Sequence, residues 1–341
     1  MVVTGGRVEV VLEGGRTVAR GGELLRGEVL VVLEQPTKCR ELKIELVCAT
    51  TGRGRAEAVR LEDEVLFKGD LEAGEHRFPF SRRLPRGPFT YEGKNVSVGW
   101  VLEAWADMPW ASFESRCVMP LEVVPSKEIE PGTSTPMLRP EALMEQRETS
   151  VQSLWFVAMT FGLAAVIAGM AFVGDMWGMW VVAGLVGVLG LAFAAFSAFL
   201  MLAEWRLGDV AFEFEAQEVS PGDAVAMSFE FEPRMRTRVK GVSMTLAGQE
   251  TTIRGSGKHT KVYTHAVGGA SYELMGARDV GAGEQVRVEH VFTVPEGLPP
   301  SFAFDVSHLS WKIRYTIDVA WWPDWRGERS MWLGSRERKG W

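Results

Sequence analysis

Two long uncharged stretches constrain this chain more than any other feature. Between Thr149 and Ala203 the only charged residue is Asp175. Residues 154–173 form a run of twenty uncharged residues. A helix of that length spans about 30 Å, which is the thickness of the hydrocarbon core of a bilayer. Residues 179–203 form a second run that is long enough to cross, so the sequence predicts two transmembrane helices.

The segment between the two runs sets their topology. Residues 174–178 are too few to hold a domain, so the predicted helices form an antiparallel hairpin. This loop contains no Lys or Arg, whereas the outer flanks contain Arg147 and Arg206. Because positive residues prefer the cytoplasmic side, we expect a two-pass protein with both termini in the cytoplasm. The alternative is a core hairpin of a soluble protein, which would not need two uncharged runs of bilayer length.

Aromatic and small residues support a lipid environment. Four tryptophans are predicted to anchor the helix ends at the membrane interfaces: Trp155, Trp177, Trp180 and Trp205. Small residues at four-residue spacing are predicted to pack the helices: Ala165, Gly169, Gly190, Ala194 and Ala198. They would close the hairpin, and the alternative is that one stripe mediates homo-oligomerisation. No ionisable residue lies deep in either run, which favours an anchor over an ion or proton path.

The regions on either side of the hairpin have the periodicity of β-strands. In residues 1–125, Leu42, Ile44 and Leu46 alternate with charged residues. In residues 206–333, every second residue from Trp311 to Trp321 is apolar or aromatic. Period-two patterns between Gly- and Pro-rich turns are typical of antiparallel sandwiches. The fold class predicted is therefore mainly β, with one sandwich on each side of a two-helix hairpin.

Two remaining segments are predicted to be linker and tail. Residues 126–153 read as a linker that begins with Pro and Gly and includes a short helix over residues 140–147. Residues 334–341 form a polar tail.

The two β-rich regions also resemble each other. An acidic glycine turn at residues 72–75 precedes a strand and then Leu84-Pro85, and a similar turn at residues 281–284 precedes a strand and then Val294-Pro295. The aromatic segment 100–110 matches residues 315–325. We interpret this pattern as the duplication of one domain.

The order of signals in each half resembles the arrestin-like superfamily. A glycine-acidic turn precedes an early strand, at residues 26–28 and 221–223. A strand led by Cys39 follows, with its counterpart near Val239, and then come a leucine-proline corner and a "tyrosine-x-isoleucine-x-valine" strand at residues 315–319. This superfamily includes arrestins, a retromer subunit and a bacterial sporulation-control protein. The resemblance implies two sandwich domains that act as an adaptor or scaffold without catalysis, and the hairpin departs from its soluble members.

Composition and motifs exclude several functions. The net charge of −7 argues against a nucleic-acid partner, which needs an excess of Lys and Arg. Three cysteines without a Cys-x-x-Cys pair predict neither a disulfide framework nor zinc, and Cys48 is expected to be a buried free thiol. If their segment is a strand, His259 and His265 share one of its faces, but no third metal ligand is evident. We therefore predict no catalytic, cofactor-binding or metal-binding residues.

A group of tryptophans is the remaining unusual feature. Strand parity predicts that Trp321 faces inward and Trp322 outward. Trp110, Trp322 and Trp325 are candidates for an exposed patch that binds a partner or touches lipid headgroups, and the alternative is core and turn packing.

These observations predict a membrane-anchored, non-catalytic adaptor. Its domains would bind another protein on the cytoplasmic side, for example by adding a strand to an exposed sheet edge. One alternative is a structural homo-oligomer that organises the membrane. A second alternative is a membrane sensor that binds a metal or a small ligand.

Overall fold

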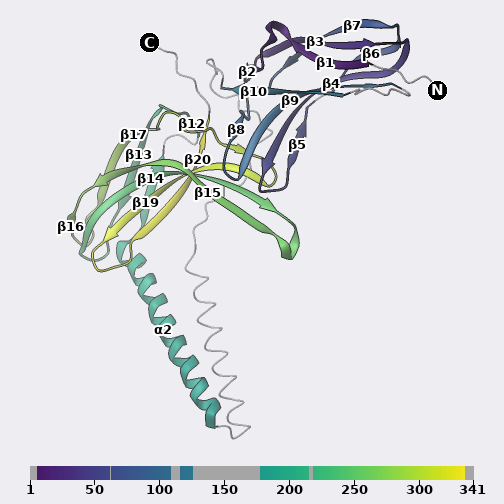
Figure 1. Cartoon of the computed structure of the whole chain (residues 1–341). Coiled ribbons are helices and arrows are strands. Elements are labelled where there is room, and N and C mark those ends of the chain that lie inside the picture. The colour runs from purple at the N-terminus through teal and green to yellow at the C-terminus, as the bar shows by residue number, and fades with distance from the viewer. Residues whose placement is uncertain (1–5, 62, 109–115, 126–176, 215–217, 335–341) are drawn as a thin grey trace.

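The computed structural model describes residues 6–61, 63–108, 116–125, 177–214 and 218–334. They form two β-rich domains and one long helix (Figure 1). The prediction of a mainly β chain with two sheet-rich domains is confirmed. The described residues contain a single long α-helix, and the first predicted transmembrane run, residues 154–173, lies outside them. The two-helix hairpin therefore stays a prediction.

The N-terminal domain contains two facing sheets. A three-stranded sheet has the order β1-β3-β7, and a larger sheet has the order β2-β10-β9-β4-β5, with β6 paired to β4 and β8 paired to β9. The strands are β1 Gly6–Leu12, β2 Val18–Arg20, β3 Leu24–Leu33, β4 Thr37–Gly52, β5 Glu57–Arg60, β6 Glu64–Leu71, β7 Gly74–Arg83, β8 Tyr91–Glu92, β9 Val96–Asp107 and β10 Arg116–Val124.

The core lies between these sheets because alternate residues of each strand face inward. Leu42, Ile44 and Leu46 of β4 are at most 3% exposed, as the alternation in the sequence predicts. Leu102 and Ala104 of β9 are fully buried beside them.

The C-terminal domain repeats this arrangement. Its sheets have the orders β11-β13-β17 and β12-β20-β19-β14-β15, with β16 paired to β14 and β18 paired to β19. The elements are α2 Trp177–Leu207, β11 Val210–Phe214, β12 Glu218–Val219, β13 Ala224–Phe231, β14 Thr237–Arg254, β15 Lys261–Met275, β16 Arg278–Val280, β17 Val286–Thr293, β18 Phe302–Ala303, β19 Ser307–Val319 and β20 Trp325–Leu333. Strand for strand, the connectivity matches that of the first domain, so the predicted duplication is confirmed.

The buried tryptophans of the two domains correct the alignment of residues 100–110 with residues 315–325 that was made from the sequence. In β9, the indole N–H of Trp100 donates to the carbonyl of Pro88 at 2.8 Å, and in β19 the indole N–H of Trp311 donates to the carbonyl of Pro299 at 3.0 Å. Trp100 thus corresponds to Trp311, four residues before the Tyr315 that the sequence alignment paired with it. That alignment was wrong because it matched the aromatic residues at the strand ends instead of the buried tryptophans.

A second correction concerns the early turn. Gly222 has φ +83°, and the amide of Ser220 donates to Asp223 Oδ2 at 2.9 Å. The matching turn in the first domain contains Gly22, with φ +81°. Residues 26–28, which the sequence analysis assigned to this turn, lie inside β3 instead. The equivalence of Cys39 and Val239 is confirmed, because β4 begins at Thr37 and β14 begins at Thr237.

All three cysteines are free thiols. Cys39 and Cys48 are buried in the first domain, and Cys117 is half-buried. Burial raises the pKa of the Cys48 thiol to about 12, and burial likewise raises the pKa of Cys39. The prediction that Cys48 is a buried free thiol is confirmed.

This difference in burial predicts a labelling pattern. In the folded protein at mildly alkaline pH, a maleimide should modify Cys117 first, because the thiolate is the reactive form and the two buried thiols stay protonated. Mass spectrometry of the labelled protein before and after unfolding in urea measures this. Modification of Cys48 in the folded protein as fast as that of Cys117 would contradict the packing described here.

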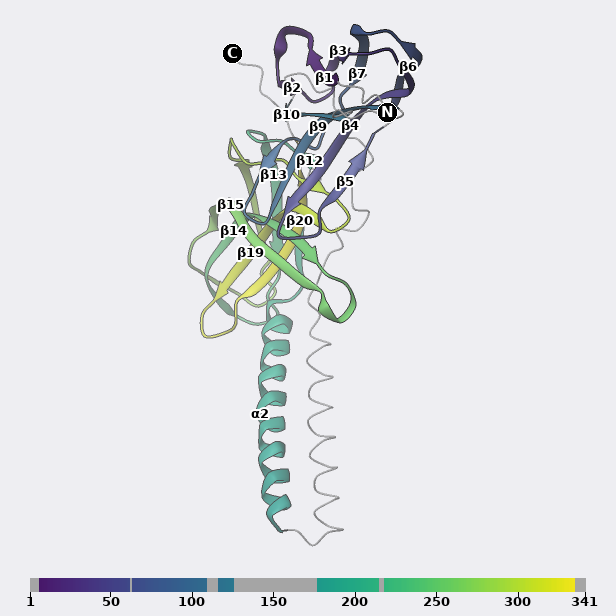
Figure 2. The same ribbon diagram turned by 45° about the vertical axis from the view of Figure 1, so that its right-hand side comes forward.

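Helix α2 stands apart from the sandwiches. It projects from the base of the C-terminal domain, on the side away from the N-terminal domain (Figure 2). Its segment Gly184–Leu207 reaches a mean hydropathy of 2.4, and only 12% of that apolar window is buried. Leu185 and Val188 are 63% and 66% exposed. The second predicted run, residues 179–203, lies within this helix.

Candidate functional site

Helix α2 is fixed to the C-terminal domain by its last turn. The Nε of Arg206 donates to Thr237 Oγ1 at 3.1 Å, and the same guanidinium donates to the carbonyl of Arg236. Leu207 is 2% exposed and packs into the domain core. Gly208 has φ +76°, and a Cβ there would lie 2.2 Å from the carbonyl oxygen of Glu232. Only glycine fits this turn. The hydrogen bonds of Arg206 and the burial of Leu207 fix the last turn of the helix to the domain.

The turn between β19 and β20 lies against this helix. Trp322 is half-buried, stacks on Phe199 of α2 at 5.0 Å between ring centroids, and lies 5.1 Å from the guanidinium of Arg206. Trp321 is 95% exposed and has φ +67°. The parity prediction for these two residues was wrong. Strand β19 ends at Val319, and a left-handed residue in the turn breaks the alternation of a strand.

Of the three residues in the predicted tryptophan patch, the two that the structure describes are each half-buried, and the patch stays a prediction. Trp325 is half-buried and packs on the C-terminal core, with its ring 6.5 Å from that of Phe229. Trp322 is covered on one side by α2. Trp110 lies outside the described residues. In the turn before Trp325, Trp321 is exposed, whereas the sequence predicted that it faces inward. The Pro323-Asp324 pair that follows it was the available signal for a turn.

The predicted interface anchors lie near both ends of α2. Trp205 is 50% exposed in the last turns, and the guanidinium of Arg234 lies 5.6 Å from its ring. Trp177 begins the helix and Trp180 follows in its first turn. At 1.5 Å per residue, Trp177 and Trp205 are separated by about 42 Å, close to the thickness of a bilayer with its headgroups. Trp155 lies outside the described residues.

The predicted packing stripe is represented on α2 by three residues. Gly190 is buried, Ala194 is half-buried and Ala198 is exposed. Ala165 and Gly169 lie outside the described residues. The packing role of the stripe stays a prediction.

The two domains meet at a buried carboxylate. Glu250 of β14 is 1% exposed. Its Oε1 accepts from the hydroxyl of Tyr91 and from the amide of Lys94 at 3.2 Å, and its Oε2 accepts from the amide of Asn95 at 2.9 Å. All three donors belong to the N-terminal domain. Burial is the main cause that raises the pKa of the Tyr91 hydroxyl, and the hydrogen bond to Glu250 is the second cause.

Close packing surrounds this carboxylate. Phe302 of the C-terminal domain contacts the ring of Tyr91 at 5.3 Å and joins the core cluster of the first domain. A Cβ on Gly54 would lie 1.8 Å from Thr252 Oγ1, so the junction requires a glycine there. Glu57 Oε1 also accepts from the amide of Val306 at 3.0 Å. These contacts predict that the two domains move as one unit.

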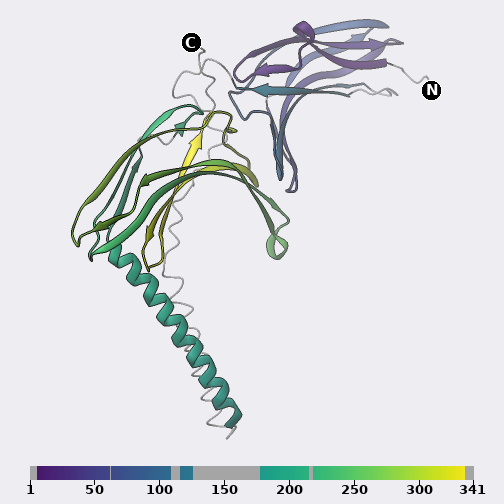
Figure 3. The same cartoon turned by 60° about the vertical axis from the view of Figure 1, so that its left-hand side comes forward.

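The open edge of the large C-terminal sheet is formed by β15. Among the described strands, β15 pairs only with β14, while its counterpart β5 in the first domain has four residues against fifteen. The β14–β15 hairpin extends beyond the body of the sheet (Figure 3). Val262 on this edge is 57% exposed. A long unpaired edge offers backbone groups to an added strand.

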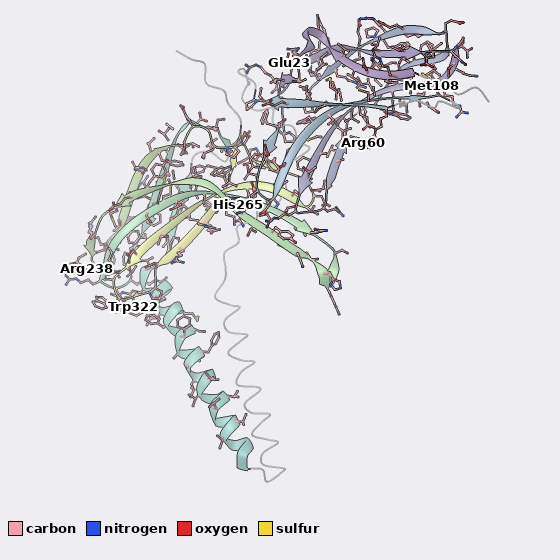
Figure 4. The ribbon with its side chains drawn as sticks, in the orientation of Figure 1. Glu23, Arg60, Met108, Arg238, His265 and Trp322 are labelled. Atoms are coloured by element: carbon pink, nitrogen blue, oxygen red, sulfur yellow. The ribbon has the colours of Figure 1, made fainter. Side chains whose placement is uncertain are left out.

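No group suited to metal binding emerges in the described ranges. Within them, no three His, Cys, Asp or Glu side chains come together as metal ligands. His265 lies half-buried on β15 (Figure 4), and His259 is exposed in the short 3-10 helix Gly257–His259.

Comparison with known proteins finds a partial similarity. No family model matches the chain. Arrestin domain-containing protein 1 of Homo sapiens is 31% identical over 119 residues, which cover 32% of this chain and 28% of the human protein. The proteins of the same name from Mus musculus and Rattus norvegicus are 31% and 29% identical over 119 residues. These matches support the resemblance of this chain to the arrestin-like superfamily.

The matched segment is only part of each arrestin-domain protein. It spans 28% of the human relative and 27% of the mouse and rat relatives. A solved structure of Spo0M, a sporulation control protein from Bacillus subtilis, aligns with a TM-score of 0.31 at 12% identity, over 39% of this chain and 50% of that one.

Proposed function

We propose that this chain is a membrane-anchored, non-catalytic adaptor of the arrestin-like type, which binds another protein through its β-rich domains. The observation that carries this proposal is a long, exposed apolar helix joined rigidly to a two-domain β unit. The similarity to an arrestin-domain protein covers 32% of this chain. The proposal extends the adaptor role to the whole chain.

Membrane anchoring explains the surface of α2. The helix presents a continuous set of large apolar side chains that are each at least half exposed: Val181, Val182, Leu185, Val188, Leu189, Leu191 and Phe196. Exposing that much apolar surface to water is unfavourable at roughly 25 cal/mol for each Å². In a bilayer the same surface is favourable, and the 31 residues of α2 are more than the roughly 20 that a crossing needs.

The base of the C-terminal domain favours a cytoplasmic orientation. Arg206 lies in the last turn of the helix, and Arg234, Arg236 and Arg238 follow on the neighbouring β13–β14 segment. Positive residues beside a membrane helix favour the cytoplasmic side. With the predicted first crossing over residues 154–173, both domains would lie on that side.

The edge of β15 is the proposed docking element for the partner. An extended peptide could continue the sheet there, with its backbone paired to β15 and its side chains above and below. Val262 and Thr264, both exposed, would lie on one face of the new pair.

The test combines membrane extraction with site-specific crosslinking. Membranes carrying the full chain are washed with alkaline carbonate, and a photo-crosslinking residue replaces Val262 on β15 or, as control, Val291 on β17, which is 63% exposed. We expect the protein to resist the wash and a discrete adduct to form from position 262 but not from 291. Release by alkali would contradict the anchor, and absence of an adduct from position 262 would contradict the docking edge.

Counting the subunits distinguishes the adaptor from the alternative, a structural homo-oligomer. A homo-oligomer that organises the membrane would show several bleaching steps per particle in single-molecule images of labelled protein in bilayers. A strictly monomeric count would remove that alternative. A stoichiometric metal in purified protein would instead favour the sensor.

A further inference from the structure

Trp321 combines two unfavourable features in water. Its side chain is 95% exposed, and its backbone has φ +67°, a left-handed conformation that is unfavourable for a residue other than glycine. Neither feature serves packing of the folded chain, because the neighbouring Trp322 makes the contact with α2. An exposed tryptophan held in this conformation is expected where its ring meets a surface outside the protein.

The contact of Trp322 determines how far along α2 the turn reaches. Its ring stacks on Phe199, which precedes Trp205 by six residues, or about 9 Å along the helix axis. The ring of Trp322 therefore reaches the level of the Phe199 ring on the apolar part of the helix.

The length of α2 places Phe199 relative to a bilayer. A hydrocarbon core of about 30 Å takes roughly 20 helical residues. Trp180 and Trp205 are the tryptophans nearest the ends of the apolar run, and such residues prefer the interfaces. Any segment of twenty residues placed between them contains Phe199. The side chain that stacks on Phe199 then lies at the boundary between hydrocarbon and headgroups.

We propose that the β19–β20 turn is a second membrane-contacting element, with Trp321 and Trp322 in the interfacial layer of the bilayer that α2 crosses. The inference rests on the proposed anchoring by α2. It adds that the C-terminal domain is seated on the lipid surface and does not swing freely above it.

The charges beside this turn fit a headgroup layer. Arg206 lies against Trp322, and Arg234 lies against Trp205. Figure 4 shows Arg238 and Trp322 at the same lower edge of the domain, beside the end of α2. Tryptophan rings at the boundary with arginines above them match the order of layers in a membrane, where phosphate groups lie outside the hydrocarbon.

A protein partner is a weaker candidate for this surface. The turn runs beside a helix whose neighbouring side chains are apolar and exposed over several turns, so a partner there would itself have to lie in the membrane. If α2 crosses the bilayer, lipid already surrounds this part of the helix, and no additional protein has to be assumed. A protein contact is therefore kept as an outcome of the test.

The test measures depth with spin labels on the full chain in lipid vesicles. In a Cys117→Ser background, the two remaining native thiols are buried. Single cysteines replace Trp321 in the turn, Leu191 on α2 as the hydrocarbon reference, and Val118 in the N-terminal domain as the aqueous reference; the last two are 62% and 50% exposed. Collision rates with oxygen, which enters lipid, and with a nickel chelate, which stays in water, are compared.

We expect the label at position 321 to lie between the two references. Its nickel collisions should fall severalfold below those at position 118, and its oxygen collisions should rise toward those at position 191. A label in place of Asp324 gives the same comparison from the same turn, should Trp321→Cys not fold.

The other outcomes are distinct. A label at position 321 that matches position 118, in vesicles that retain the protein through an alkaline wash, would overturn the seated domain and leave the anchor intact. Low collision rates with both reagents would indicate burial against protein and would also overturn the proposal. Loss of the protein in the wash would overturn the anchor and the seated domain together.

Discussion

Replacement of Glu250 by alanine is expected to lower the free energy of unfolding by about 3 kcal/mol and to loosen the junction between the domains. The carboxylate is 1% exposed and accepts three hydrogen bonds from the opposite domain. Hydrogen bonds to a charged group contribute about 1.5–3 kcal/mol each, and buried donors left without a partner cost about 1–3 kcal/mol. Partial entry of water should offset some of this loss.

Two comparisons isolate the role of the carboxylate. Tyr91→Phe removes one donor and leaves Glu250 with the amides of Lys94 and Asn95, so a smaller loss is expected. Glu289→Ala removes an exposed carboxylate of β17, and its effect should stay within about 0.5 kcal/mol. Urea unfolding in detergent measures stability, and the distance between spin labels on the two domains measures the junction. A Glu250→Ala protein as stable as Glu289→Ala, with an unchanged distance distribution, would contradict this account.

The burial of Glu250 could have been predicted from its position in the strand. Val242, Met244 and Leu246 mark the inward face of β14, and the same alternation continues through Gly248 and Glu250. A charged residue in phase with the apolar face signals a buried polar contact at that end of the strand. The sequence analysis above predicts no such junction. The identity of the donors could not be predicted, because Tyr91 and Asn95 lie more than 150 residues away.

Local periodicity gave most of the remaining fold. The strands follow from alternation, because one face of each sheet packs on the core. The exposed position of Trp321 did not follow, since alternation holds only within a strand and β19 ends at Val319. The alignment of the two halves failed for a related reason. Aromatic residues mark both buried strand centres and turns, and only the hydrogen bonds of Trp100 and Trp311 distinguish them.

Replacement of Trp311 by alanine is the substitution with the largest expected effect, a loss of about 3–5 kcal/mol. The side chain is fully buried, and its indole N–H donates to the carbonyl of Pro299 at 3.0 Å. The ring also fills the space over Gly248, where a Cβ would lie 2.8 Å from Trp311 Cη2. Alanine would leave a cavity in the C-terminal core and an unpaired carbonyl.

Three variants test this packing together. Trp311→Phe keeps a ring and should recover part of the loss, while Trp321→Ala removes an exposed ring and should not lower stability in detergent. Because Trp100 makes the same bond to Pro88, Trp100→Ala should destabilise the N-terminal domain in the same way. Hydrogen exchange would then show the loss of protection centred on β9 for Trp100→Ala and on β19 for Trp311→Ala. Equal effects of Trp321→Ala and Trp311→Ala on urea unfolding would be incompatible with a core built around the repeated tryptophan.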